Sequence, residues 1–303
     1  MPEGLEPYVP PGFEAFWRET TQIAQDAPLD YSVESVSEPS TPGHDLRVLS
    51  FRGISGERLH GWLAVPYSDV IHPGFLWIAP YSRWSMQPNE YGVRSGYTSL
   101  SFNFFGESAF HREDYTPARG YFADGVSSRE TWIFRRMFQN AVIALRILAD
   151  QAAVDENRLA CAGMSQGGGI GIWMGAWVQQ VKAVIADMPF LGGMPWVLQA
   201  KAFRYPLKEL TDFMAESAGN DAAVRETLSY FDTINQASFC QVPTRVTLGL
   251  RDPAVRPEQA RAVFDALPGV KELEEIDFGH DWHPRMIEGG QDWFRKHLIN
   301  SDR

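Results

Sequence analysis

The hydrophobic positions near the N-terminus follow a helical period first and a strand-like period afterwards. Behind a Pro-Pro-Gly breaker, residues 13–24 carry apolar side chains near one helical face, namely Phe13, Phe16, Trp17 and Ile23. This spacing predicts an amphipathic helix that packs on the body of the protein. Residues 46–51 and 59–65 are apolar stretches separated by Gly53-Ile54-Ser55-Gly56, and this order predicts an antiparallel hairpin that opens a sheet.

From residue 75 onwards, short and nearly continuous apolar runs alternate with longer helical stretches. Such runs are typical of parallel strands that are covered on both faces. We expect buried strands at 75–79, 99–102, 159–162, 183–186 and 245–250. We expect helices over 129–150 and near 167–178, 221–229, 257–266 and 284–298. The alternation predicts one doubly wound, mostly parallel α/β domain over residues 1–303, with an N-terminal extension of about residues 1–40.

The segment from about residue 190 to 240 breaks this alternation. It is rich in aromatic residues and lies between one predicted strand and the next. An insertion behind the carboxyl end of a strand lies where open α/β sheets bind ligands, so it could form part of a lid. Extra helices that only thicken the core explain the pattern equally well, and both interpretations stay open.

Composition and charge exclude several classes of protein. With 44% apolar and 21% charged residues among 303, the chain is not a disordered or fibrous protein. Its net charge is −11 and it has no basic run, so we expect no nucleic-acid partner. We also expect no membrane partner, because no apolar run approaches the roughly 20 residues that cross a bilayer. Two cysteines are too few for a disulfide framework, and the first residues do not read as an export signal, so we expect a cytoplasmic location.

The strongest local motif is Gly163-Met164-Ser165-Gln166-Gly167, which follows an apolar strand and opens a glycine-rich helix. In a G-x-S-x-G motif the serine occupies a strained turn between strand and helix, and its hydroxyl projects from the edge of the sheet. The backbone amide of the following residue, Gln166, would then point at a developing oxyanion. We therefore predict that Ser165 is a catalytic nucleophile.

A serine nucleophile needs a base and an orienting acid, which follow it in the order acid and then histidine. A short apolar-polar run that ends at Ile276 is expected to be the last strand, and His280, just beyond it, is the expected base. His283 is the second choice, and His297 falls within the terminal helix. Asp252 lies behind the penultimate strand and is the expected acid, and Asp187 is its rival.

The second oxyanion donor is expected in the loop that follows an earlier strand, residues 79–84. Pro80 has no N–H, so the candidate donors are Tyr81 and Ser82, and we favour the backbone amide of Tyr81. Neither a metal-ligand pattern nor a glycine-rich phosphate loop occurs, so we expect no metal and no cofactor.

The sequence resembles the acetyl xylan esterase and cephalosporin C deacetylase family of α/β-hydrolases, carbohydrate esterase family seven. The densest part of the resemblance is Gly163-Met164-Ser165-Gln166-Gly167-Gly168-Gly169. Further matches are spread over most of the chain, at Gly12–Trp17, Gly61–Pro66, Gly120-Tyr121-Phe122 and Ala186–Leu191.

The resemblance implies an α/β-hydrolase fold and a serine esterase that removes acetyl groups from sugars and from small or antibiotic esters. The family's nucleophile, acid and base fall on Ser165, Asp252 and His280, and its oxyanion donors on the amides of Tyr81 and Gln166. The partner it implies is a small-molecule or oligosaccharide ester, and members of the family tend to form homo-oligomeric hexamers.

Two loops depart from the family pattern. Ala79-Pro80 and Ser82-Arg83-Trp84 replace the usual His-Gly and glycines around the oxyanion tyrosine, and Phe104-Phe105-Gly106 stands in the loop that usually reads Arg-Gly-Gln-Gly. We expect Trp84, Phe104 and Phe105 to narrow the acyl pocket, and we expect Trp84 or Trp282 to stack on a sugar.

Three functions remain in competition. The first is the carboxyl-ester hydrolase, the second a longer-chain esterase or a serine peptidase or amidase with the same triad, and the third a binding protein that retains the fold without turnover. The intact order of serine, aspartate and histidine favours the enzymes, because a binding protein has no need for all three.

Overall fold

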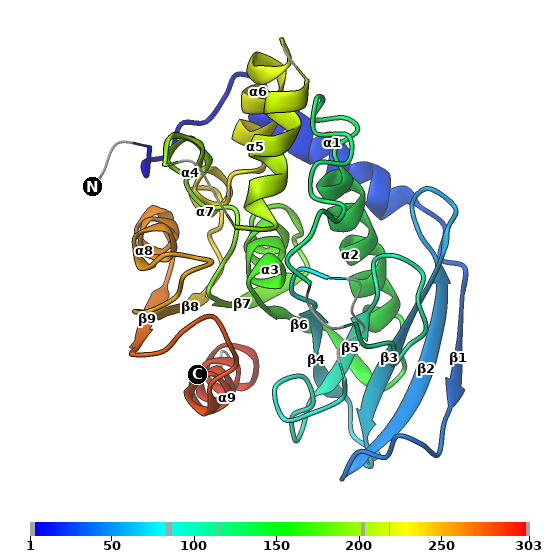
Figure 1. Cartoon of the computed structure of the whole chain (residues 1–303). Coiled ribbons are helices and arrows are strands. Elements are labelled where there is room, and N and C mark those ends of the chain that lie inside the picture. Colours follow the sequence, from blue (N-terminus) through cyan, green and yellow to red (C-terminus); the bar gives the residue numbers. More distant parts are fainter. Residues whose placement is uncertain (1–3, 83–86, 114–115, 201–203, 218, 301–303) are drawn as a thin grey trace.

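The computed structural model describes residues 4–82, 87–113, 116–200, 204–217 and 219–300, and these carry a helical N-terminal segment and one large sheet (Figure 1). Within these ranges nine strands form the sheet in the order β1-β2-β3-β5-β4-β6-β7-β8-β9. Their bounds are β1 Tyr31–Ser35, β2 His44–Arg52, β3 Arg58–Pro66, β4 His72–Ile78, β5 Thr98–Phe102, β6 Val154–Met164, β7 Val181–Asp187, β8 Thr244–Gly249 and β9 Lys271–Ile276.

The sheet has an antiparallel edge and a parallel body. The pairs β1-β2, β2-β3 and β3-β5 are antiparallel, whereas all pairs from β5 through β9 are parallel. The predicted hairpin is β2 and β3, in which Leu49 pairs with Gly61. Because the carboxyl ends of parallel strands meet at one edge of the sheet, the loops that follow β4, β6, β7, β8 and β9 in the sequence can contribute to one site.

Helices cover both faces of the sheet, as the nearly continuous apolar runs predict. On one face lie α1 (Phe13–Asp26), α2 (Ile133–Ala149), α3 (Gln166–Trp177) and α8 (Pro257–Ala266), and the opposite face is covered by α9 (Pro284–Phe294) and a π-helical turn, η1 (Arg295–Ile299) (Figure 1). β4 shows why both faces need cover: Leu76 and Ile78 enter the core beneath α2 and α3, while Phe75 and Trp77 enter the second core beneath α9.

The segment between β7 and β8 is helical, as expected. It contains α4 (Met194–Gln199), α5 (Leu207–Glu216), α6 (Asp221–Phe231) and α7 (Thr233–Ala237). A fully buried aspartate, Asp232, ties this segment to the N-terminal residues, because its carboxylate accepts a hydrogen bond from the Tyr8 hydroxyl at 2.6 Å. None of the described helices is both long and apolar enough to cross a membrane.

The structure confirms the five buried strands and the helices, with three differences. The edge strand β1 was not predicted, because only alternate residues in it are partly covered. Ile23 of α1 was expected to face the body of the protein, but it is exposed; Thr20, Thr21 and Ala24 complete the buried face instead. The terminal helix changes from α-helical to π-helical at Arg295.

Candidate functional site

Ser165 lies in a strained turn between β6 and α3. Its backbone angles are φ 56° and ψ −118°, a conformation that L-residues adopt at a cost of about 1–3 kcal/mol. Three backbone hydrogen bonds hold it there: its own N–H donates to the carbonyl of Asp187 at 2.8 Å, and its carbonyl accepts from Phe190 at 2.9 Å and from Gly169 at 3.0 Å. The turn is therefore fixed by the loop behind β7.

The two glycines of the motif are required by close backbone approach. A Cβ atom on Gly167 would lie 2.0 Å from the carbonyl oxygen of Ile78, and one on Gly163 would lie 2.5 Å from the backbone of Gly167. Real Cβ atoms do not tolerate such distances, so larger residues would push the turn away from β4.

A buried carboxylate holds a histidine next to this turn. Asp252, in the loop behind β8, has a fully buried side chain, and its Oδ2 lies 2.6 Å from Nδ1 of His280. Its other oxygen accepts hydrogen bonds from the backbone amides of Ala254 at 2.7 Å and Val255 at 2.9 Å. The His280 side chain is 19% exposed, so the carboxylate is shielded while the imidazole reaches solvent.

The other candidate acid, Asp187, makes different contacts. Its carbonyl accepts from Ser165, but its buried side chain is hydrogen-bonded to Thr247 and lies close to Arg245 and Arg94. Burial raises the pKa of the Asp187 carboxyl, against the opposing effects of these three groups. Its side chain is thus part of a polar cluster beneath the sheet edge.

The other two candidate histidines also have structural contacts. Nδ1 of His283 accepts a hydrogen bond from the backbone amide of Arg285 at 3.2 Å and thereby caps α9. His297 packs its ring against Trp293 at 4.2 Å between centroids, and burial lowers its pKa.

The segment behind β4 approaches the N-terminus of α3. The Ser82 amide donates a hydrogen bond to the Tyr121 hydroxyl at 3.2 Å. Of the two candidate oxyanion donors, Ser82 therefore already has a hydrogen-bond acceptor within the protein. The Tyr121 hydroxyl in turn donates to Oε1 of Gln166 at 2.9 Å, and its ring stacks on Tyr81 with 4.5 Å between centroids. Arg83 and Trp84 lie outside the described residues.

These residues surround one cavity of about 320 Å³. Ser165, His280, Tyr81 and Ser82 line it together with residues from the end of β6, from the loops that follow β4, β7, β8 and β9, and from the insertion: Pro80, Met164, Phe190, Arg204, Tyr205, Pro206, Ala254, Asp281 and Trp282. Trp282 lies at the cavity, and its ring packs on Tyr91 at 4.7 Å between centroids.

Phe104 and Phe105, expected at the acyl pocket, are not among the described residues that line the cavity. Phe104 is buried against Phe102 with 4.6 Å between ring centroids, because it extends the core face of β5. Phe105 packs on Tyr121 at 4.3 Å instead of reaching the cavity. Tyr121 and Phe190 were not predicted near the site; only the Gly120-Tyr121-Phe122 and Ala186–Leu191 matches to the family gave a signal for them.

No three histidine, cysteine, aspartate or glutamate side chains cluster as metal ligands within the described ranges. The groups that this cavity offers for chemistry include a serine, a histidine paired with a carboxylate, and backbone amides. A mostly parallel sheet with a strained serine between a strand and the helix behind it is the fold of the α/β-hydrolases.

Comparison with known sequences identifies the family within this class. The model of the acetyl xylan esterase (AXE1) family matches residues 5–296, and the chain belongs to this family. Among curated proteins, acetyl esterase Axe7A of Xylanibacter ruminicola is 23% identical over 297 residues. That alignment covers 93% of this chain and 66% of the relative, so the chain spans about two thirds of the relative's length.

Two solved structures share the fold closely. An acetyl xylan esterase from Paenibacillus sp. R4 superposes with a TM-score of 0.88 at 23% identity, covering 98% of this chain and 100% of the other. Acetyl xylan esterase 1 from Thermoanaerobacterium sp. JW/SL YS485 gives a TM-score of 0.84 at 20% identity, with 96% and 95% covered. The α/β-hydrolase fold expected from the sequence is confirmed.

Proposed function

We propose that this protein is a serine carboxyl-ester hydrolase that removes acetyl groups from acetylated sugars or small esters. The observation that carries the proposal is that Ser165, in a strained strand-to-helix turn, lines the same cavity as His280, whose Nδ1 lies 2.6 Å from Asp252. Membership in the acetyl xylan esterase family supports the acetylated substrate.

In the proposed reaction, Oγ of Ser165 attacks the ester carbonyl while Nε2 of His280 takes its proton. Asp252 keeps the imidazole in the required tautomer and stabilises the imidazolium that forms. The imidazolium then protonates the leaving alkoxide, so that an alcohol departs and an acetyl-serine remains. A water molecule, deprotonated by His280, releases acetate and restores the hydroxyl of Ser165.

The negative charge on the carbonyl oxygen is stabilised by backbone N–H groups in this proposal. Gln166 is the first residue of α3, so its amide has no partner within the helix, and the helix dipole adds positive potential there. Tyr81 is the second proposed donor, because the neighbouring Ser82 amide already donates to Tyr121. Losing one such donor typically costs about 100- to 1000-fold in kcat.

The size of the cavity supports a small substrate. About 320 Å³ is at the lower end of the volumes of ligand sites in proteins. Trp282 lines the cavity, and its ring is the proposed stacking surface for a sugar. A longer-chain esterase and an amidase use the same triad, and a non-catalytic binding protein would need none of it, so the test must separate all three.

The test is hydrolysis of p-nitrophenyl acetate, butyrate and octanoate, of an aminoacyl anilide, and of acetylated xylo-oligosaccharide and cephalosporin C. Wild type is compared with Ser165→Ala and with Ser32→Ala, a matched control on the exposed edge strand β1. We expect turnover that requires Ser165 and falls steeply beyond acetate.

Preference for octanoate or for the anilide would retain the triad but refute the deacetylase. Turnover unaffected by Ser165→Ala would refute the serine mechanism, and its complete absence from wild type would favour a binding protein.

The proposal also includes a cytoplasmic location and a homo-oligomer. Both cysteines, Cys161 and Cys240, are free and buried, and burial raises the pKa of the Cys240 thiol to about 11. Such thiols are compatible with a reducing compartment. Cell fractionation tests the location, and light scattering on the purified protein tests the oligomer.

A further inference from the structure

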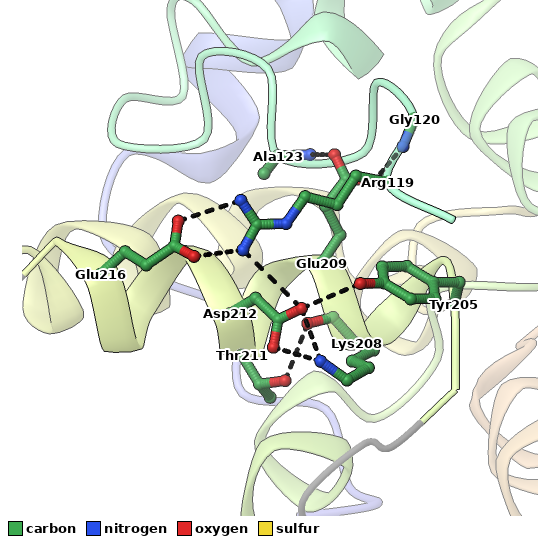
Figure 2. A network of polar contacts seen from close by, with 9 residues as sticks. All are labelled: Arg119, Gly120, Ala123, Tyr205, Lys208, Glu209, Thr211, Asp212 and Glu216. Atoms are coloured by element: carbon green, nitrogen blue, oxygen red, sulfur yellow. Dashed lines mark hydrogen bonds and ion pairs between the residues drawn. The ribbon is translucent and has the colours of Figure 1, made fainter. Parts of the chain in front are cut away.

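A buried glutamate of the insertion holds a loop from a distant part of the chain. Glu209, on α5, is 5% exposed, and its two carboxylate oxygens accept hydrogen bonds from the backbone amides of Gly120 at 2.8 Å and Ala123 at 3.0 Å (Figure 2). Residues 103–132 contain no described helix or strand, and although turns within the segment satisfy several of its amides, those of Gly120 and Ala123 use an acceptor from α5. Glu209 supplies two of them, as charge-assisted bonds in a buried site.

Between these two amides lies Tyr121, which joins the two segments of the proposed oxyanion hole. Its hydroxyl accepts from the Ser82 amide at 3.2 Å and donates to Oε1 of Gln166 at 2.9 Å. Its ring contacts Tyr81 and Phe105, with 4.5 Å and 4.3 Å between centroids. The buried side chain of Tyr121 thus links Ser82, which follows the proposed donor Tyr81, to the side chain of the other proposed donor, Gln166.

We propose that Tyr121 and Glu209 are positioning residues that set the separation of the Tyr81 and Gln166 amides. This inference rests on the proposed function and deepens it. Tyr121 fixes the two donor segments relative to each other, and Glu209 fixes the loop that carries Tyr121. Neither side chain is among the described residues that line the cavity, so both act through other residues.

The same helix also shapes the substrate side of the cavity. Arg204, Tyr205 and Pro206, just before α5, line the cavity, and the Tyr205 hydroxyl donates to Asp212 at 3.1 Å. Asp212 in turn binds Nζ of Lys208 at 2.6 Å (Figure 2). The insertion therefore forms part of the wall of the substrate cavity and also holds the loop that carries Tyr121. Of the two interpretations that the sequence left open, a functional role of the insertion is the one this proposal adopts.

A second contact between insertion and loop is weaker. Arg119 pairs with both oxygens of Glu216 and lies 3.8 Å from Asp212 (Figure 2). The side chains of Arg119 and Glu216 are 50% and 60% exposed, so solvent and salt screen this pair. The buried Glu209 is accordingly the contact to test.

The experiment compares Tyr121→Phe and Glu209→Gln with two matched controls. Tyr31→Phe removes a hydroxyl that donates to Asp150 at 2.6 Å on the edge strand β1. Glu57→Gln alters a carboxylate that likewise accepts a backbone amide, that of Ser55 at 2.9 Å, in the β2–β3 turn. For each variant, kcat and KM for p-nitrophenyl acetate, the inhibition constant of ethylboronic acid and the unfolding temperature are measured.

We expect Tyr121→Phe to lower kcat by about 10-fold or more, with KM within about 2-fold of wild type. Ethylboronic acid forms a tetrahedral adduct with the serine and places an oxygen in the oxyanion hole, so its inhibition constant should rise by the same factor as kcat falls. Glu209→Gln keeps one acceptor and should shift both quantities in the same direction by a smaller factor. Both controls should match wild type.

An unchanged kcat in folded Tyr121→Phe would overturn the inference. So would a loss of kcat without weaker boronate binding, because a purely structural defect would not follow the oxyanion analogue. Should Glu209→Gln fail to fold, Tyr121→Phe still decides. Failure of the proposed function is recognised separately from the wild type and Ser165→Ala: turnover then persists in Ser165→Ala, is absent from wild type, or favours octanoate or the anilide, whatever Tyr121→Phe does.

Discussion

Two buried aspartates in this protein bind similar kinds of hydrogen-bond donor, backbone amides and one side chain, but they lie in different surroundings. Asp252 accepts from two backbone amides with one oxygen and faces His280 with the other. Asp232 accepts from the amides of Gly193 and Ile234 with one oxygen, and from the amide of Met194 and the Tyr8 hydroxyl with the other.

The difference lies in what the side-chain donor contacts. His280 lines the cavity with Ser165, whereas Tyr8 belongs to the N-terminal segment, and the Asp232 side chain lies at the junction of that segment, α4 and α7. Burial raises the pKa of the Asp232 carboxyl, while all four of its hydrogen bonds oppose this effect. A buried carboxylate with amide donors is therefore no sign of catalysis by itself. Whether such a carboxylate is a candidate catalytic group depends on its side-chain partner and on whether that partner lines a cavity.

The largest expected effects are on turnover, at the pair formed by Asp252 and His280. In Asp252→Asn the amide oxygen still accepts from Ala254 and Val255, so the fold should persist, but the NH₂ group faces Nδ1 of His280 and favours the wrong tautomer. We expect kcat to fall by about 10⁴-fold, the loss that the same substitution causes in a well-studied Ser-His-Asp protease. Steady-state kinetics checks this, and more than about one tenth of wild-type activity would contradict the proposed role.

A large effect on stability is expected at Asp232. Both of its oxygens face N–H donors, so Asn in either orientation sets an NH₂ group against a buried backbone N–H. Asp232→Asn should lower the free energy of unfolding by about 2–4 kcal/mol, while kcat per folded molecule stays within about 2-fold of wild type. Urea denaturation and kinetics at low temperature measure the two. If kcat fell as it does in Asp252→Asn, the contrast between the two carboxylates would be wrong.

Removing only the side-chain donor of Asp232 should have a smaller effect. Tyr8→Phe loses one partly buried hydrogen bond of 2.6 Å and leaves the three amides in place. We expect about 1 kcal/mol less stability and unchanged kcat, measured by urea denaturation. Tyr67→Phe, at a side chain that is 73% exposed, is the control and should change neither.

The smallest effect is expected at the second-choice histidine. His283→Ala removes a 3.2 Å cap from the first turn of α9, which should cost about 0.5 kcal/mol of stability and leave kcat within about 2-fold of wild type. The same substitution at His280 should abolish turnover. Kinetics and thermal denaturation on both variants check this, and a comparable loss of kcat in His283→Ala would reopen the choice of base.

Much of the fold was predictable because burial imposes local patterns. The apolar runs at 75–79, 159–162 and 183–186 predicted parallel strands, and each is one with both faces covered. The edge strand β1 was missed because exposure leaves too little pattern. Ile23 was misplaced because a residue at the border of a helical face can point either way, and only the packing partner decides.

By itself the sequence determined the doubly wound fold, the family and the motif around Ser165, since periodicity, turn chemistry and the Gly-x-Ser-x-Gly spacing are local properties of the chain. It also identified Asp252 and His280 as candidates from their places behind strands. Only the tertiary structure decided which groups meet. It pairs Asp252 with His280, and it makes His283 a helix cap. It packs Phe104 and Phe105 away from the cavity, and it brings Glu209 into contact with the loop of Tyr121. These contacts join residues far apart in the chain, and no local pattern encodes the direction of a side chain in a long loop.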